Sequence, residues 1–391
     1  MRLAKLAPVL FALTATACVQ LDADDTPGPG GGKACTTARV IAGNPKASSS
    51  DTTSWDPAGH PAKADPPMHF GNIAQRGRTI LVSTGRSIWR LELDAAAPAF
   101  VRVAGSETED PSYRPTGACA DVRFLANDGL AWLPDGRLIT GDDWANGVIE
   151  LSDPLSPSCT AKPIAGTARD LIGTDVRPGQ TYMPGDLEGP GATARFAAPN
   201  DAISDDAGNV YIRDRGNKKI KRIANDAMRT VTTVFTLHDE LQDFNALAWA
   251  HGALYAGGIN FDGTRVIKIN VSTGASEPYV NDADVPRPDR SPSAASLPIT
   301  MVGLGDDLLV YASGGYLYRI APDGSVAHAA GMGSRNTDLT AADYAGDIPA
   351  LDVPLHFLDG LVGGGNLTVD GGHVLVPSFD DGWGLWDFTC E

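Results

Sequence analysis

Apolar and polar residues alternate in six short segments spread along the chain. The segments are SIWRLEL (87–93), GVIELS (147–152), KIKRIA (219–224), RVIKIN (265–270), YLYRIA (316–321) and GLWDFT (384–389). Each segment is preceded by a polar turn and, before that turn, by a second apolar run. Before the second run come a first short strand and then a glycine-bearing turn. A period of two residues is typical of β-strands, so the pattern predicts a three-stranded antiparallel meander that occurs six times.

A fourth apolar segment ending in Ala-Gly follows three of the meanders, as in FVRVAGS, AKPIAGT and VAHAAGM. A segment of the same kind, ARVIAGN (38–44), precedes the first meander, whereas the last meander has no fourth strand after it. In a ring, the N-terminal segment can complete the last sheet and leave no open edge. We therefore predict an all-β fold: a six-bladed β-propeller closed by an N-terminal outer strand that completes the last blade.

Ring closure also predicts how four of the five cysteines pair. Cys35 lies three residues before the N-terminal strand, and Cys390 directly follows the strand with which it would pair. Cys119 opens the second blade, and Cys159 immediately precedes the outer strand of that blade. We predict the disulfides Cys35–Cys390 and Cys119–Cys159, with free thiols as the alternative.

The N-terminal segment MRLAKLAPVLFALTATAC has two basic residues, a short apolar run and then small residues. This order is typical of a secretory signal, and ATAC resembles the lipobox of bacterial lipoproteins. We predict a signal peptide over residues 1–17, lipidation of Cys18, a flexible tether over 18–36 and the propeller over 37–391. The protein would then be lipid-anchored in the bacterial cell envelope. Ordinary cleavage at Ala-Thr-Ala gives the alternative, a soluble secreted or periplasmic protein.

Composition and charge agree with this prediction. The chain has 44 glycines and 28 prolines, which favours short strands joined by many turns. Its formal net charge is −17, which excludes nucleic acid as a partner because binding to phosphate requires a basic patch. We expect contact with a membrane through the lipid anchor alone, and a monomer.

One copy of the repeat resembles an NHL repeat. In residues 189–223, a glycine-rich lead is followed by Ala194 and Phe196, Pro199, a turn ending in Gly-Asn, the strand VYI, Asp214 and a second Gly-Asn. The other copies keep the strand pattern and lose most of this signature. The resemblance implies a propeller over the whole repeat region, with a specific match over about forty residues.

The repeat also resembles the six-bladed gluconolactonase and regucalcin family. Those enzymes hold a divalent metal at the channel mouth, and the resemblance implies that the similar positions in this chain are Asn127, Asn200, Asn245 and Asp359. Their oxygens would suit Ca²⁺ or another divalent cation, with Asp128 or Asp201 as a base. The first blade offers no glutamate, and Leu125 stands where the family has an arginine. The alternative is that these side chains hydrogen-bond the preceding turns as part of the repeat.

Four long insertions, 44–68, 106–122, 167–194 and 332–354, run from outer strands to the next inner strands. Long loops in a compact domain are often functional. We expect one loop-rich face that exposes the aromatic residues Trp55, Tyr113, Tyr182 and Tyr344, although the loops could simply cap the ring. The leading hypothesis is a non-catalytic binding or scaffold module for a protein or glycan ligand. The alternative is a metal-dependent, lactonase-like hydrolase with its site at the channel mouth.

Overall fold

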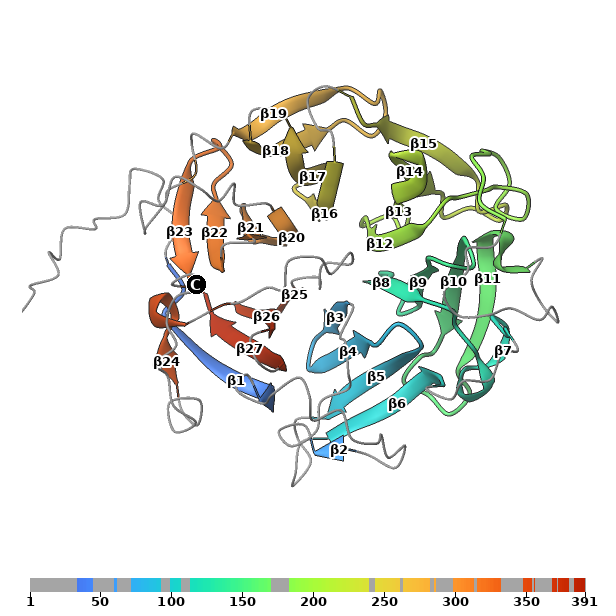
Figure 1. Cartoon of the computed structure of the whole chain (residues 1–391), viewed down its shortest axis with the longest axis horizontal. Coiled ribbons are helices and arrows are strands. Elements are labelled where there is room, and N and C mark those ends of the chain that lie inside the picture. Colours follow the sequence, from blue (N-terminus) through green and yellow to red (C-terminus); the bar gives the residue numbers. More distant parts are fainter. Residues whose placement is uncertain are drawn as a thin grey trace, which may run out of the picture.

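The first and last strands of the propeller pair with each other. In the computed structural model of the protein, β1 (Thr37–Asn44) runs antiparallel to β27 (Trp383–Thr389), with Thr37 opposite Thr389 and Asn44 opposite Trp383. The pairing closes six small sheets into a ring around a channel (Figure 1). The predicted six-bladed β-propeller with an N-terminal closing strand is therefore confirmed.

The structure describes residues 34–44, 60–61, 72–92, 99–106, 113–169, 183–238, 243–260, 263–281, 285, 298–312, 315–331, 347–353, 355, 368–370, 372–379 and 383–390. The predicted signal peptide, Cys18 and most of the predicted tether lie outside these residues. No helix in the described ranges is long and apolar enough to cross a membrane.

The first three blades follow one another in the sequence, and the strands of each are named in order from the channel outward. Blade 1 contains β3 (Ile73–Arg76), β4 (Thr79–Ser83), β5 (Ser87–Glu92), β6 (Ala99–Gly105) and the short β2 (His60–Pro61). Blade 2 contains β8 (Asn127–Trp132), β9 (Leu138–Asp142), β10 (Gly147–Ser152), β11 (Thr160–Gly166) and the short β7 (Gly117–Ala118). Blade 3 contains β12 (Pro199–Ser204), β13 (Val210–Asp214), β14 (Lys219–Ile223) and β15 (Val231–Thr236).

The other three blades complete the ring in the same order. Blade 4 contains β16 (Asp243–Ala250), β17 (Ala253–Asn260), β18 (Gly263–Ile269) and β19 (Ser276–Asn281). Blade 5 contains β20 (Pro298–Leu304), β21 (Asp307–Ala312), β22 (Tyr316–Ile320) and β23 (Val326–Ala330). Blade 6 contains β25 (Thr368–Asp370), β26 (His373–Phe379), β27, β1 and the short β24 (Ile348–Pro349).

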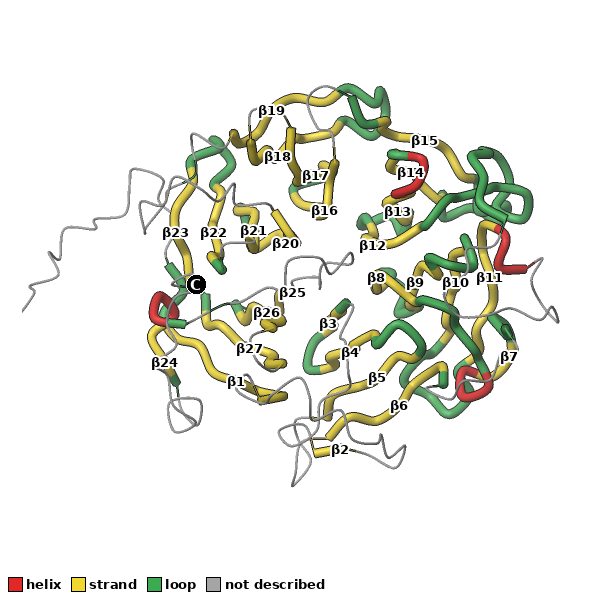
Figure 2. Tube along the Cα trace, in the orientation of Figure 1, coloured by secondary structure: helices red, strands yellow, loops and turns green. Residues whose placement is uncertain are grey.

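Helical segments in the described chain are single 3₁₀ turns, as Figure 2 shows. They are η1 (Cys119–Asp121), η2 (Thr167–Arg169), η3 (Arg215–Asn217) and η6 (Ala350–Asp352). The short outer strands β2, β7 and β24 are not evident in the repeat pattern, because each contributes only two residues.

The hydrophobic core lies between neighbouring blades. On β9, Leu138 packs with Leu81 of blade 1, whereas the next residue, Ile139, packs with Ile212 of blade 3. Successive side chains of a strand point to opposite faces, so both faces of a blade are buried. This explains why the middle strands are apolar at nearly every position rather than at every second one.

The Ala-Gly signature of the outer strands has a steric cause. Gly105, Gly166 and Gly331 have φ values of +85°, +83° and +84°, and each follows the same shift in the ladder to the third strand. A Cβ atom on Gly166 would lie 2.2 Å from the carbonyl oxygen of Asn146. These positions therefore need glycine for both backbone conformation and space.

Two disulfides are present, Cys35–Cys390 and Cys119–Cys159, in the predicted pairing. The first joins residues 355 positions apart and clasps the closing blade, while the second spans 40 positions within blade 2. Disulfides persist in oxidising compartments, so they indicate an extracellular or periplasmic location.

Substituting Gly166 tests the steric explanation. We expect Gly166→Ala to lower the free energy of unfolding by about 3 kcal/mol or more, because it combines an unfavourable φ with a backbone clash. Gly85→Ala is the matched control, since Gly85 has φ of +82° and a Cβ added to it would meet no heavy atom within 4 Å. The control should lose only about 1 kcal/mol in urea unfolding. Equal losses of stability in the two variants would show that the backbone shifts to relieve the clash at position 166.

Removing each disulfide separately tests the role of ring closure. Chain entropy predicts losses of about 6 kcal/mol for Cys35→Ala/Cys390→Ala and about 4 kcal/mol for Cys119→Ala/Cys159→Ala. All four cysteines are buried, so the cost of removing their sulfur atoms should be similar. Urea denaturation of the oxidised proteins gives the comparison. A larger loss for the local pair would contradict the expectation.

Candidate functional site

The inner strands begin at one face of the ring, which we call the mouth face. Near its start, each inner strand of blades 2 to 5 shifts register against the second strand. The shifts lie between Asp128 and Leu130, Asn200 and Ala202, Phe244 and Ala246, and Pro298 and Thr300. Such bulges redirect side chains and often occur beside functional sites.

The residues predicted as metal ligands occupy different positions relative to these bulges. Asn127 is the first residue of β8 and pairs with the last residue of β9. Asn200 is the second residue of β12, and Asn245 is itself the extra residue of its bulge. Asp359 lies outside the described residues. The three asparagines look equivalent in the sequence repeat but are not equivalent in the structure.

Arg213 joins two of the predicted ligands across the boundary between blades 3 and 4. Its Nε donates to Oδ1 of Asn200 at 2.8 Å, and its Nη1 donates to Oδ1 of Asn245 at 3.3 Å. Nη1 also donates to the carbonyl oxygen of Phe244 at 2.8 Å, and the guanidinium carbon lies 5.6 Å from the centre of the Phe244 ring. Arg213 is only 2% exposed.

The guanidinium of Arg213 supplies a positive charge between the two amide oxygens. Both oxygens accept hydrogen bonds from it, and the metal site stays a prediction from the sequence. No group of three or more His, Cys, Asp or Glu side chains in the described ranges could hold a metal ion. The sequence did contain a signal for Arg213, which is a charged residue directly after the apolar run VYI, at the position where β9 has Gly141.

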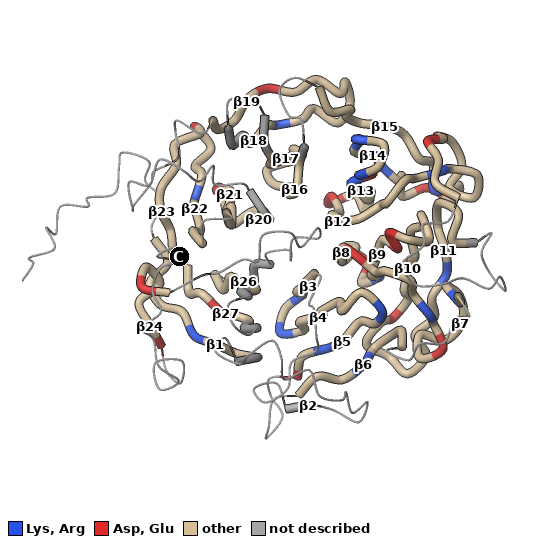
Figure 3. Tube along the Cα trace, viewed as in Figure 1, with Lys and Arg blue, Asp and Glu red and all other residues tan. Residues whose placement is uncertain are grey.

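Two acids and two arginines lie together at the mouth face, beside the channel end of blades 2 and 3 (Figure 3). Asp128 is partly exposed, and burial together with the negative charge of Asp143 raises its pKa to about 7. Arg213 and Arg215 oppose this rise. Arg215 also forms an ion pair with Asp143 at 3.5 Å. A carboxyl group that titrates near neutrality can take up or release a proton during binding or catalysis.

The neighbouring buried acids have a structural role. Asp142 is fully buried and accepts hydrogen bonds from the backbone N–H groups of Leu125 and Ala126, both at 3.0 Å. Asp214 is also fully buried and accepts from the N–H of Ala197 at 2.7 Å. Each carboxylate fixes the segment that leads into an inner strand.

Two buried amide atoms at the mouth face have no hydrogen-bond partner among the described residues. They are Oδ1 of Asn127 and Nδ2 of Asn200. Leaving such a group unpaired costs about 1–3 kcal/mol, so each atom offers a hydrogen-bonding position to water or to a bound polar group. Asp201, beside Asn200, is 7% exposed and has φ of +49°, an uncommon conformation for aspartate.

Tyr113 corrects the prediction of exposed aromatic residues. It is 3% exposed and packs with Leu125, Ala145 and Ala168 beneath the loop that carries it. Burial and the negative charge of Asp142 raise its pKa well above 10. The other predicted aromatics, Trp55, Tyr182 and Tyr344, lie outside the described residues.

Neither a protein-family model nor a curated protein sequence matches the chain. Among solved structures, an auxiliary nutrient binding protein from Bacteroides thetaiotaomicron is similar, with a TM-score of 0.54 and 9% identity over 91% of this chain and 77% of that one. A gluconolactonase from Xanthomonas campestris has a TM-score of 0.49 and 12% identity, covering 83% and 88%. Virginiamycin B lyase from Staphylococcus aureus has a TM-score of 0.47 and 12% identity, covering 84% and 97%.

At these identities, structural similarity establishes the fold and no shared activity. The chain has the architecture of a six-bladed propeller. The NHL resemblance stays a prediction from the sequence.

The titration of Asp128 can be measured through stability. Its folded pKa of about 7 lies above the ordinary value of 3.8, so ionisation should reduce stability as the pH rises from about 4 to about 7. We expect Asp128→Asn to match the wild type at pH 4 and to be more stable at pH 8. The full pKa shift corresponds to about 4 kcal/mol of stability. The gain in the free energy of unfolding should be smaller than this, because the group is partly exposed. Thermal unfolding across this range is the measurement, and a variant less stable at pH 8 would contradict the expectation.

Proposed function

We propose that the protein is an exported binding module that holds a protein or glycan ligand on its mouth face. The observations that carry this proposal are two inner-strand asparagines, whose Oδ1 (Asn127) and Nδ2 (Asn200) have no partner in the described ranges, and the partly exposed Asp128 that follows Asn127 in the chain. Fixed donors and acceptors on a rigid scaffold suit recognition of polar groups, because little ordering is needed on binding.

The location of Arg213 favours binding over metal-dependent hydrolysis. The amide oxygens that resemble the metal ligands of the lactonase family are engaged by its guanidinium. Export is supported by the two disulfides, and we propose lipidation of Cys18 as the means of surface attachment.

Asp128 favours a hydrolase as the second candidate. A carboxyl with a pKa of about 7 is suited to act as a general base on water near neutral pH. In that case Asp128 would take the proton from water as the water oxygen attacks an ester or lactone carbonyl. It would return the proton to the alcohol oxygen as the bond between that oxygen and the carbonyl carbon breaks. Arg213 and Arg215 lie near enough to favour the ionised carboxylate.

Binding to a printed glycan array and a peptide array, with wild type and variants, tests the proposal. We expect Asp128→Asn to weaken the strongest interaction about tenfold without lowering the unfolding temperature at pH 8. Asp206→Asn is the matched control, because it removes an exposed carboxylate from the β12–β13 turn on the opposite face. The proposal is contradicted if Asp128→Asn weakens the binding of none of the array ligands, or if nothing on either array binds.

A panel of lactones, aryl esters and phosphotriesters distinguishes the two candidates. Turnover by chelated wild-type protein that Asp128→Asn abolishes would favour the hydrolase. Turnover that appears only with added Ca²⁺ or another divalent cation would favour the metal-dependent alternative. No turnover in either condition, together with array binding, is the result expected for a binding module.

A further inference from the structure

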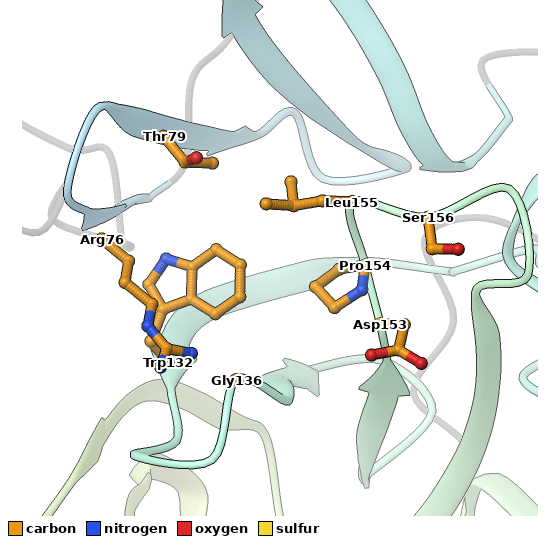
Figure 4. Close-up of a pocket in the computed structure, with 8 residues that line it drawn as sticks. All are labelled: Arg76, Thr79, Trp132, Gly136, Asp153, Pro154, Leu155 and Ser156. Atoms are coloured by element: carbon orange, nitrogen blue, oxygen red, sulfur yellow. The ribbon is translucent and has the colours of Figure 1, made fainter.

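A pocket lies on the face opposite the mouth face, between blades 1 and 2. It has a volume of about 380 Å³, within the usual range for sites that hold small ligands. Its walls come from the turn after β3, the end of β8 and the turn after β10 (Figure 4). We call it the Trp132 groove, defined by Arg76, Trp132, Gly136, Asp153, Leu155 and Ser156.

Arg76 forms one wall and is held in place by its surroundings. Its Nη2 donates to the carbonyl oxygen of Pro134 at 3.1 Å, and its guanidinium carbon lies 5.9 Å from the centre of the Trp132 ring. A Cβ on Gly136 would lie 2.7 Å from Nη1, so the glycine leaves room for the guanidinium. Arg76 is exposed and lines the groove, so its remaining N–H groups are available to a ligand there.

Trp132 supplies an aromatic surface and an unused donor. Its indole Nε1 is buried and has no acceptor among the described residues. A buried indole N–H normally finds a hydrogen-bond partner, so an oxygen atom of a ligand could complete it. Figure 4 shows the ring between Arg76 on one side and Leu155 with Pro154 on the other.

The opposite wall combines an acceptor with an apolar edge. Asp153 is exposed, and its carboxylate can only accept hydrogen bonds when ionised. Leu155 is 44% exposed, which is unusual for a large apolar side chain in this protein. The hydroxyl of Ser156 is already paired with that of Ser158 at 2.7 Å. The groove therefore has N–H donors on one wall, a carboxylate on the other and apolar surface between them.

We infer that the Trp132 groove binds a saccharide unit. A sugar ring presents hydroxyl groups that both donate and accept hydrogen bonds, and a C–H face that packs on an aromatic ring. A hydrocarbon would leave Arg76 and the indole N–H unpaired, and a simple anion would face the carboxylate of Asp153. A peptide finds no strand edge for backbone pairing among the described residues of the groove, because turns form most of its walls. The site is separate from the one proposed on the mouth face.

Titration of the full exported chain with maltose, cellobiose, lactose and chitobiose tests this inference, followed by saturation-transfer NMR and calorimetry. We expect saturable binding of at least one disaccharide. Arg76→Ala and Trp132→Phe should each weaken it about tenfold, since one removes a donor wall and the other removes the indole N–H. Asp128→Asn on the mouth face should leave it unchanged, which separates this test from that of the proposed function.

Arg78→Ala is the matched control, because Arg78 is exposed in the same turn as Arg76 but does not line the groove. The Arg78→Ala variant should bind the disaccharide with the affinity of the wild type. Thermal unfolding should show that all variants fold. The inference is overturned if no disaccharide saturates the protein at about 10 mM. It is also overturned if neither groove variant weakens binding, or if Trp132→Phe instead abolishes binding to a peptide array while no sugar binds.

Discussion

The fold depends on the fact that every blade has two apolar faces. A sheet of this kind cannot be stable alone, and adding neighbours on one side leaves the other side exposed. Only a closed ring covers all of the faces. The pairing between β1 and β27 closes the ring, so all six hydrophobic layers between blades depend on it. This explains why the chain begins its domain with an outer strand, and why Cys35 and Cys390 meet where that strand is added. The small residues at the ladder shifts follow from the same close packing.

The candidate site is a product of this packing rather than an addition to it. At the mouth face the inner strands converge, and the first polar residues of each strand are pressed together between blades. Buried charges are tolerated only when they are paired or hydrogen-bonded. Arg213 meets this requirement with oxygens from two blades, and Asp142 meets it with backbone N–H groups. Asp214 meets it with the N–H of Ala197 and an ion pair to the buried Lys221 at 2.7 Å. Asp128 is the member of this group that stays partly open to solvent while its ionisation is opposed by its surroundings. The site thus combines fixed hydrogen-bonding groups with one acid that responds to pH.

Sequence patterns predicted most of the architecture but less of the candidate site. Strand positions such as 147–152 and 384–389 follow from local apolar periodicity, and closure follows from the misplaced ARVIAGN strand. The register at the inner-strand starts could not be predicted in the same way, because a bulge displaces one residue without changing the apolar pattern. Asn127, Asn200 and Asn245 therefore align in the sequence but differ in the structure. The partners of Arg213 lie partly in the next blade, and the burial of Tyr113 depends on how its loop folds back on blade 2. Both are long-range contacts that a single repeat does not encode.

The disulfide between Cys35 and Cys390 has a mechanical consequence. Any tension that reaches the propeller along the chain before Cys35 passes at once into a covalent bond with the far end of the domain. The load is then shared between β1 and β27, which lie side by side and are pulled from the same point. Separating them would require sliding a full ladder of hydrogen bonds rather than unzipping it from one end. The seam between β1 and β27 is therefore reinforced by a covalent bond at the end where the chain enters the domain.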